Sequence, residues 1–165
     1  MKYILPIIWT ITFFAFDNKP LGFTSTSPLY THFTYNFAHA NILHLLTNVI
    51  AYTYIHKITD KLNITKEATI SSFLSAIAAS FLIISDKPTV GASGFLYAMF
   101  AAMIAGVISG RMKITNKKQF ATFYGSIALA TALQPLVSHN INFAIHILSF
   151  TINIFLLFTY YKIRN

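Results

Sequence analysis

Long apolar runs alternate with short polar or charged segments along the whole chain. Of the 165 residues, 55% are hydrophobic and 10% are charged, whereas a soluble domain carries about 25% charged residues. So few charges cannot cover a surface that faces water, and the chain is therefore predicted to be an integral membrane protein. Its length predicts one compact unit, a single membrane domain over residues 1–165.

The apolar runs predict six membrane-spanning helices, because a bilayer core needs about 20 helical residues, usually roughly 17 to 25. The runs cover residues 3–16, 38–56, 67–85, 92–109, 119–138 and 141–161. The first run lacks a small-residue cleavage site before Asp17 and is interpreted as a retained helix. The expected fold is an all-α bundle of six transmembrane helices.

The basic residues indicate which ends of these helices face the cytosol. With the amino terminus inside, the cytosolic basic residues are Lys2, Lys57, Lys61, Lys66, Arg111, Lys113, Lys117, Lys118, Lys162 and Arg164. Only Lys19 and Lys87 then lie outside, which is a strong positive-inside bias. Both termini are therefore predicted to be cytosolic. The excess of basic residues that gives the net charge of +8 is explained by these cytosolic loops. The expected partner is therefore the lipid bilayer, and no nucleic acid is expected.

The longest outer connection, residues 17–37, is rich in aromatic side chains. They are Phe23, Tyr30, Phe33, Tyr35 and Phe37. Aromatic rings are favoured at the membrane interface, which is where we expect these to lie. An ordinary interfacial loop and a functional loop fit this composition equally well.

Polar side chains inside a bilayer are costly, so each indicates a functional site. In "FAHANILHLLTNVIAY", His44 and Asn48 are four residues apart and share one helix face, with His39 nearer the surface and off that face. In "SHNINFAIHILSF", His139 is close to the surface and His146 is about two turns deeper. Hydrogen bonding between helices is the alternative role for each.

The stretch "TVGASGFLYA" places a serine at an expected helix start after Pro88. Ser93 and Tyr97 share one face, and the first N–H groups of a helix are unpaired and partly positive. Close packing by Gly91 and Gly94 is the alternative role. The three polar clusters lie at compatible depths near the outer side, which argues for one common site.

A serine beside an imidazole suggests nucleophilic catalysis, because serine is a weak nucleophile until a base takes its proton. The acidic residues are Asp17, Asp60, Glu67 and Asp86. All are expected in loops or on the cytosolic side, so none is available to orient His146. A Ser93–His146 dyad is the expected machinery, with Tyr97 packed against the imidazole. The Ser93 N–H, His44 and Asn48 are candidate donors to an oxyanion.

These residues resemble the rhomboid intramembrane serine proteases. The family motif G-x-S-G at the start of the fourth span is matched by Gly91, Ser93 and Gly94, with an aromatic residue, Tyr97, four positions later. The second-span pattern, a histidine, four residues, a histidine, three residues and an asparagine, is matched by His39, His44 and Asn48. The last-span histidine corresponds to His146 rather than to His139.

The sequence departs from this family at two positions in the last span. The family usually carries glycines three and seven residues after the last-span histidine, where this chain has Ser149 and Asn153. Serine is small enough to preserve close packing with the fourth span. Asparagine is larger and polar, so Asn153 is expected to form hydrogen bonds within the bundle. The first connection also lacks the Trp-Arg pair that is common in the family.

The resemblance implies an intramembrane serine endopeptidase with its site open to the outer side. The small size and the absence of a recognisable targeting segment predict a bacterial cytoplasmic membrane. Its substrates would be membrane proteins cleaved near the outer end of a transmembrane helix, and it would require no cofactor. A catalytically silent relative that binds membrane helices is the alternative. A small transporter or channel is a weaker one, because buried carboxylates and paired halves are absent from the sequence. Metal-dependent hydrolysis is disfavoured because the histidines lack i, i+4 pairs.

Overall fold

The computed structural model describes residues 2–17, 19–110, 116, 118, 121 and 142–164. Regular structure in these ranges is helical, apart from one isolated bridge between Phe23 and Thr89. The helices are α1 (Ile4–Ala15), η1 (Lys19–Leu21), α2 (Thr31–Thr34), η2 (Tyr35–Phe37), α3 (Ile42–Lys61), α4 (Thr65–Phe81), α5 (Ser93–Ile108) and α7 (Phe143–Arg164). The all-helical prediction is confirmed for the described residues, and the predicted span 119–138 lies outside them.

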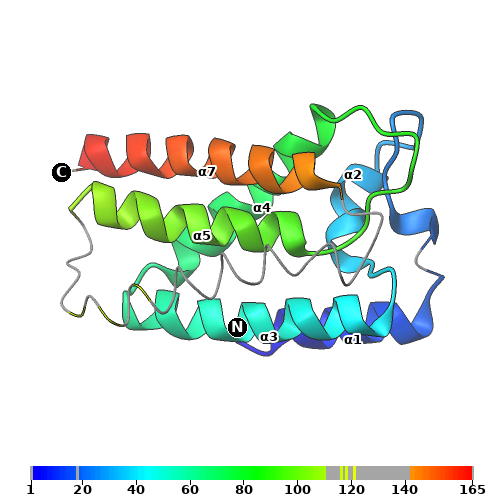
Figure 1. The fold of residues 1–165 in the computed structure, drawn as a ribbon, viewed down its shortest axis with the longest axis horizontal. Coiled ribbons are helices and arrows are strands. Elements are labelled where there is room, and N and C mark those ends of the chain that lie inside the picture. The colour runs from blue at the N-terminus through cyan, green and yellow to red at the C-terminus, as the bar shows by residue number, and fades with distance from the viewer. Residues whose placement is uncertain are drawn as a thin grey trace.

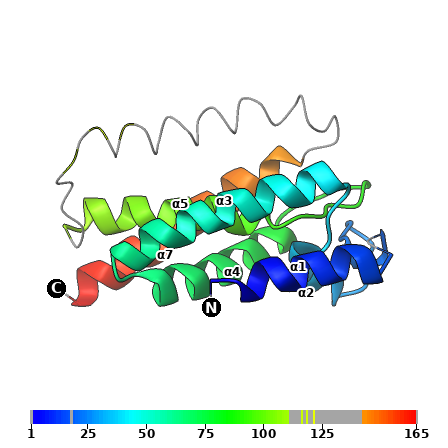
Figure 2. The same cartoon turned by 90° about the horizontal axis from the view of Figure 1, so that it is seen from below.

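The long helices run roughly along one common direction (Figures 1 and 2). Helix α7 packs against α5, and α4 packs against both, while α1 packs against α3. The interface side of α5 is built of small buried residues, including Ala98, Ala102 and Gly106. Small residues let helix backbones approach closely inside a membrane, where lipid supplies no hydrophobic drive for association. This packing holds α5 and α7, the two helices that carry the predicted dyad, side by side.

Three predicted helix ends differ from the structure by four or five residues. Helix α3 continues to Lys61, past the predicted residue 56, and local hydrogen bonds explain the other two differences. Helix α3 begins at Ile42 rather than near residue 38, because the Asn41 side chain caps it by accepting the His44 N–H at 2.8 Å. Helix α4 ends at Phe81, although the apolar run continues to residue 85. There Ser85 leaves the helical path and pairs with Ser25, whose N–H donates to the Ser85 carbonyl at 2.8 Å.

The connection between α1 and α3 is folded onto the loop that precedes α5. Phe23 and Thr89 exchange backbone hydrogen bonds of 3.2 and 2.8 Å. Tyr30 and Phe33 are about half exposed, but Phe23 and Tyr35 are fully buried. The expectation that all these rings lie at the interface is therefore wrong for Phe23 and Tyr35. They are core residues because the connection packs inward against α4 and the 82–92 loop.

Within the described ranges, α7 alone is both long and apolar enough to cross a membrane: the stretch Phe143–Ile163 has 21 residues and contains an 18-residue window with a mean hydropathy of 1.8. Helices α1 and α5 are apolar but shorter. Exposed aliphatic side chains such as Ile7, Ile50 and Ile147 nevertheless cover the outside of α1, α3 and α7. Figure 1 shows the connection between α1 and α3 at one end of the bundle and the carboxyl terminus at the other. Which end faces the cytosol stays a prediction.

Candidate active site

Ser93 is the first residue of α5, at the bundle end where the connection between α1 and α3 folds over. The loop before it turns at Gly91, whose φ of 119° lies in a region that side-chain-bearing residues rarely adopt. The Gly91 N–H donates to the Tyr35 carbonyl at 2.9 Å, which fixes the turn. Ser93 is consequently buried, at 7% exposure, at a helix start whose N–H groups have no partner within the helix.

The His146 side chain reaches this serine from α7. Its Nε2 lies 2.7 Å from Ser93 Oγ, which is a short hydrogen bond between two buried groups. The imidazole stacks on the Tyr97 ring with a centroid distance of 4.4 Å and an interplanar angle of 7°. The structure thus brings together Ser93, His146 and Tyr97 in the arrangement that the sequence predicted. The alternative histidine, His139, lies outside the described residues.

No carboxylate orients the imidazole among the residues that the structure describes. His146 Nδ1 is buried and has no hydrogen-bond partner within the described ranges. Where Nε2 accepts the Ser93 proton, Nδ1 must carry the other proton. The ring is therefore oriented by the Tyr97 stack and by its bond to Ser93 rather than by a third charged residue.

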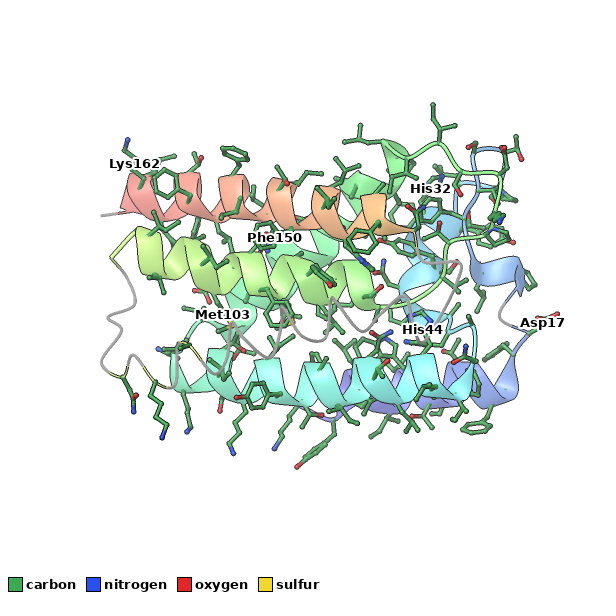
Figure 3. All side chains as sticks on the ribbon, in the orientation of Figure 1. Asp17, His32, His44, Met103, Phe150 and Lys162 are labelled. Carbon is green, nitrogen blue, oxygen red and sulfur yellow. The ribbon has the colours of Figure 1, made fainter. Side chains whose placement is uncertain are left out.

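His44 packs directly against the turn before the serine. A Cβ atom added at Gly91 would overlap His44 Cε1 and lie 2.6 Å from His44 Nε2. Figure 3 shows His44 on the face of α3 that looks toward α5, at the end of the bundle opposite Lys162. The motif glycine therefore has a steric role, because only a residue without Cβ leaves room for this imidazole.

Asn48 follows His44 by one helical turn and is 5% exposed. Its Nδ2 is a buried donor with no partner among the described residues. A buried donor without a partner is costly, so an unpaired Asn48 Nδ2 fits a group that hydrogen bonds to a bound ligand. His39 is fully buried, and its ring packs edge to face against His44 at a centroid distance of 5.3 Å and against Trp9 at 5.8 Å. His39 therefore packs behind His44.

The second motif glycine, Gly94, lies in the contact between α5 and α7. A Cβ there would stand 3.0 Å from Ile145 Cγ1 and 3.2 Å from Ser149 Oγ. Both distances are tighter than ordinary contacts, so Gly94 allows α7 to come near enough for His146 to reach Ser93. Ser149 is fully buried in this contact, in agreement with the expectation that serine preserves the packing.

Asn153 is also fully buried, and its amide hydrogen bonds to two neighbouring helices. The Nδ2 group donates to the Ala98 carbonyl of α5 at 2.6 Å and to Ser72 Oγ of α4 at 3.1 Å. The Oδ1 atom accepts from Ser75 Oγ of α4 at 3.2 Å. The prediction that Asn153 would form hydrogen bonds within the bundle is confirmed.

Three residues near the site were missed by the sequence reasoning. Asn142 Nδ2 donates to Thr89 Oγ1 at 2.8 Å, which joins the residue before α7 to the loop before Ser93. An asparagine ahead of an apolar run is a typical helix-start signal, which is the sequence feature that marks Asn142. Tyr35 Oη donates to the Ala76 carbonyl at 2.8 Å, and burial raises the pKa of this phenol. No local sequence signal predicts that contact.

The comparisons with known proteins agree with this geometry. The family model described as the Rhomboid domain matches residues 26–163, which include every residue of the candidate site. No curated protein matches the sequence. The rhomboid family is membrane-embedded and consists of intramembrane serine proteases together with inactive relatives. Since the match covers most of the sequence, the chain belongs to the rhomboid family.

Proposed function

We propose that the chain is an intramembrane serine endopeptidase that works through a Ser93–His146 dyad. The observation that carries this proposal is the 2.7 Å contact between Ser93 Oγ and His146 Nε2, with both groups buried. An inactive family member has no need to keep a nucleophile and a base in contact. The stack of Tyr97 on the imidazole adds support, because it restricts the ring to one orientation.

In the first half-reaction, Ser93 Oγ attacks the carbonyl carbon of the scissile peptide bond. Its proton passes to His146 Nε2 as the C–O bond forms and the carbonyl oxygen becomes an oxyanion. The Ser93 N–H, His44 and Asn48 Nδ2 are the proposed donors to that oxyanion. The C–N bond then breaks, and Nε2 returns the proton to the leaving amine.

In the second half-reaction, water attacks the ester carbon of the acyl-enzyme and gives a proton to Nε2. The breakdown of this second tetrahedral intermediate releases the new carboxyl group and returns the proton to Ser93 Oγ. The proposed substrates are membrane proteins, cleaved near the outer end of a transmembrane helix. The proposed location is a bacterial cytoplasmic membrane with the site open to the outer side.

Fluorophosphonate labelling of the purified, detergent-solubilised chain tests the dyad. The wild type should label, and Ser93→Ala and His146→Ala should each lose labelling. His32→Ala is the matched histidine control, because His32 lies at the same end of the bundle but is stacked between Phe23 and Phe81. Ser71→Ala is the matched control for a buried serine on another helix. Both controls should label like the wild type.

An absence of labelling in a wild type with a cooperative thermal unfolding transition would refute the proposal. The chain would then be a silent family member. Labelling that survives His146→Ala but is lost in His139→Ala would assign the base to His139. Cleavage itself is tested by co-reconstituting the chain into liposomes with a single-span membrane protein and following the appearance of two fragments.

A further inference from the structure

A buried polar cluster centred on Asn153 joins α7 to α4 and α5. It lies about two helical turns further along α7 than His146. The Asn153 amide uses both N–H groups and its carbonyl oxygen in three hydrogen bonds, to Ala98, Ser72 and Ser75. All the side chains involved are at most 1% exposed. An amide satisfied in this way is a strong and specific contact in a low-dielectric interior, where each bond demands a defined geometry.

The cluster is in register with the dyad on both helices. Asn153 follows His146 by seven residues, which is close to two full turns, so both side chains leave α7 on one face about 10 Å apart. Ala98 follows Ser93 by five residues, about 8 Å further along α5. The Ser93–His146 and Ala98–Asn153 contacts therefore join the same two helices, α5 and α7, at two positions along their length. Between them, a Cβ at Gly94 would lie 3.2 Å from Ser149 Oγ, so the two helices are close there as well.

The acceptor on α5 is a main-chain carbonyl, which cannot turn away as a side chain can. The short hydrogen bond of 2.6 Å from Asn153 Nδ2 to the Ala98 carbonyl therefore fixes the axial position of α7 relative to α5. The two serines bond the same amide from a second helix, α4, and this second anchor fixes the rotation of α7 about its axis. Ser72 and Ser75 are three residues apart and so share one face of α4.

We propose that Asn153 is a positioning residue, whose hydrogen bonds to Ala98, Ser72 and Ser75 set the register of α7 so that His146 Nε2 meets Ser93 Oγ. This inference rests on the proposed dyad and adds a part that the dyad needs. His146 has no partner for Nδ1 among the described residues, so the placement of its ring depends on the placement of its helix. Asn153 therefore acts through His146 and does not touch substrate.

The test exploits the absence of cysteine from the chain. Ser93→Cys introduces a single thiol beside His146, and its alkylation by iodoacetamide is followed as a function of pH. The imidazole favours the reactive thiolate, so the rate profile should have a lower midpoint than in Ser93→Cys/His146→Ala, by about one pH unit. This difference measures contact between the two side chains and requires no substrate cleavage.

Adding Asn153→Ala to Ser93→Cys should remove most of that difference, so that the profile resembles the one without His146. Ser72→Ala, which takes away one hydrogen bond and leaves the bond to Ala98, should shift the midpoint partway. Leu157→Ala is the matched control, because Leu157 is buried one turn further along α7 and has no polar role. It should lower the thermal unfolding midpoint but leave the alkylation profile unchanged.

The proposal is overturned if Asn153→Ala and Ser72→Ala leave the profile of Ser93→Cys unchanged. It is also overturned if Leu157→Ala shifts the profile as much as Asn153→Ala does, because general loosening would then explain the effect. If Ser93→Cys and Ser93→Cys/His146→Ala have the same profile, the dyad and this inference both fail. If the midpoint of Ser93→Cys is lowered by His146 and rises again in Asn153→Ala as expected, but the wild type shows no fluorophosphonate labelling, the proposed function alone is refuted.

Discussion

Gly91→Ala tests most directly whether His44 is packed against the turn that precedes Ser93. The added Cβ would overlap His44 Cε1 and lie 2.6 Å from Nε2, at a residue whose φ is 119°. The left-handed backbone costs about 1–2 kcal/mol for a residue with a side chain. Forcing an extra methyl group into a packed site adds about 1–3 kcal/mol. The free energy of unfolding should therefore fall by about 2–5 kcal/mol.

Gly110 provides a matched control for the backbone cost. Its φ is also positive, at 73°, but a Cβ there would have no atom within 4 Å. Gly110→Ala should therefore lower the free energy of unfolding by only about 1–2 kcal/mol. Removing the imidazole relieves the overlap, so Gly91→Ala should be less destabilising in a His44→Ala background than in the wild type. A double-mutant cycle on these two residues measures that coupling directly.

Thermal unfolding in detergent and fluorophosphonate labelling together read out the result. Because Gly91→Ala displaces a proposed oxyanion donor, the labelling rate should fall by about 10²-fold, whereas Gly110→Ala should label at the wild-type rate. Equal destabilisation by Gly91→Ala and Gly110→Ala, with no coupling to His44, would refute the contact between His44 and the turn. A normal labelling rate in Gly91→Ala would remove His44 from the oxyanion site.

Three further predictions concern neighbouring contacts. Tyr97→Phe keeps a ring to stack on His146 and should label at a rate within about threefold of the wild type. Tyr97→Ala removes that ring and should slow labelling by about tenfold or more, which corresponds to a loss of about 1.4 kcal/mol or more from the orientation of the imidazole. Asn142→Ala removes the hydrogen bond to Thr89 and should lower the free energy of unfolding by about 1 kcal/mol, with little further loss in Asn142→Ala/Thr89→Val; additive losses would contradict the pairing. Burial lowers the pKa of His32 below its usual 6.5, so the folded chain binds fewer protons there than the unfolded chain, and the stability that neutral His32 contributes is present above pH 6.5 and is lost as the pH falls through the folded pKa. His32→Phe keeps the aromatic stack and should reduce the loss of thermal stability between pH 7 and pH 5; an unchanged pH dependence would show that His32 does not titrate in that range.

The sequence predicted the dyad because a membrane helix makes polar residues conspicuous. Ser93, His146 and Asn48 lie in apolar runs where an unpaired polar group is costly, so their presence alone indicated a role. Helical spacing then related Ser93 to Tyr97. Those two arguments need no tertiary information, and the structure brings Ser93, His146 and Tyr97 into contact. Their roles in catalysis stay predictions until labelling tests them.

The loop contacts could not be predicted in the same way. Phe23 and Tyr35 have the composition of interfacial aromatic residues, and nothing in their neighbours indicates that the chain turns inward there. Their burial depends on backbone bonds between segments more than fifty residues apart, such as Gly91 to Tyr35. The end of α4 was missed for a related reason. Its apolar run continues beyond Phe81, and the pairing of Ser85 with Ser25 holds the following residues away from the helical path.

Asn153 shows how a departure from a family pattern can be physically consistent with the same geometry. A glycine at this position would let α7 approach α5 through the absence of a side chain, leaving close packing to fix the register. Asparagine occupies that space and replaces packing with three directional bonds to α4 and α5. Because His146 lacks a carboxylate partner within the described residues, the precision of the dyad must come from the placement of the helices. Substitutions two turns below the nucleophile should therefore impair catalysis more than their distance suggests, and Asn153 is the position where that effect should be largest.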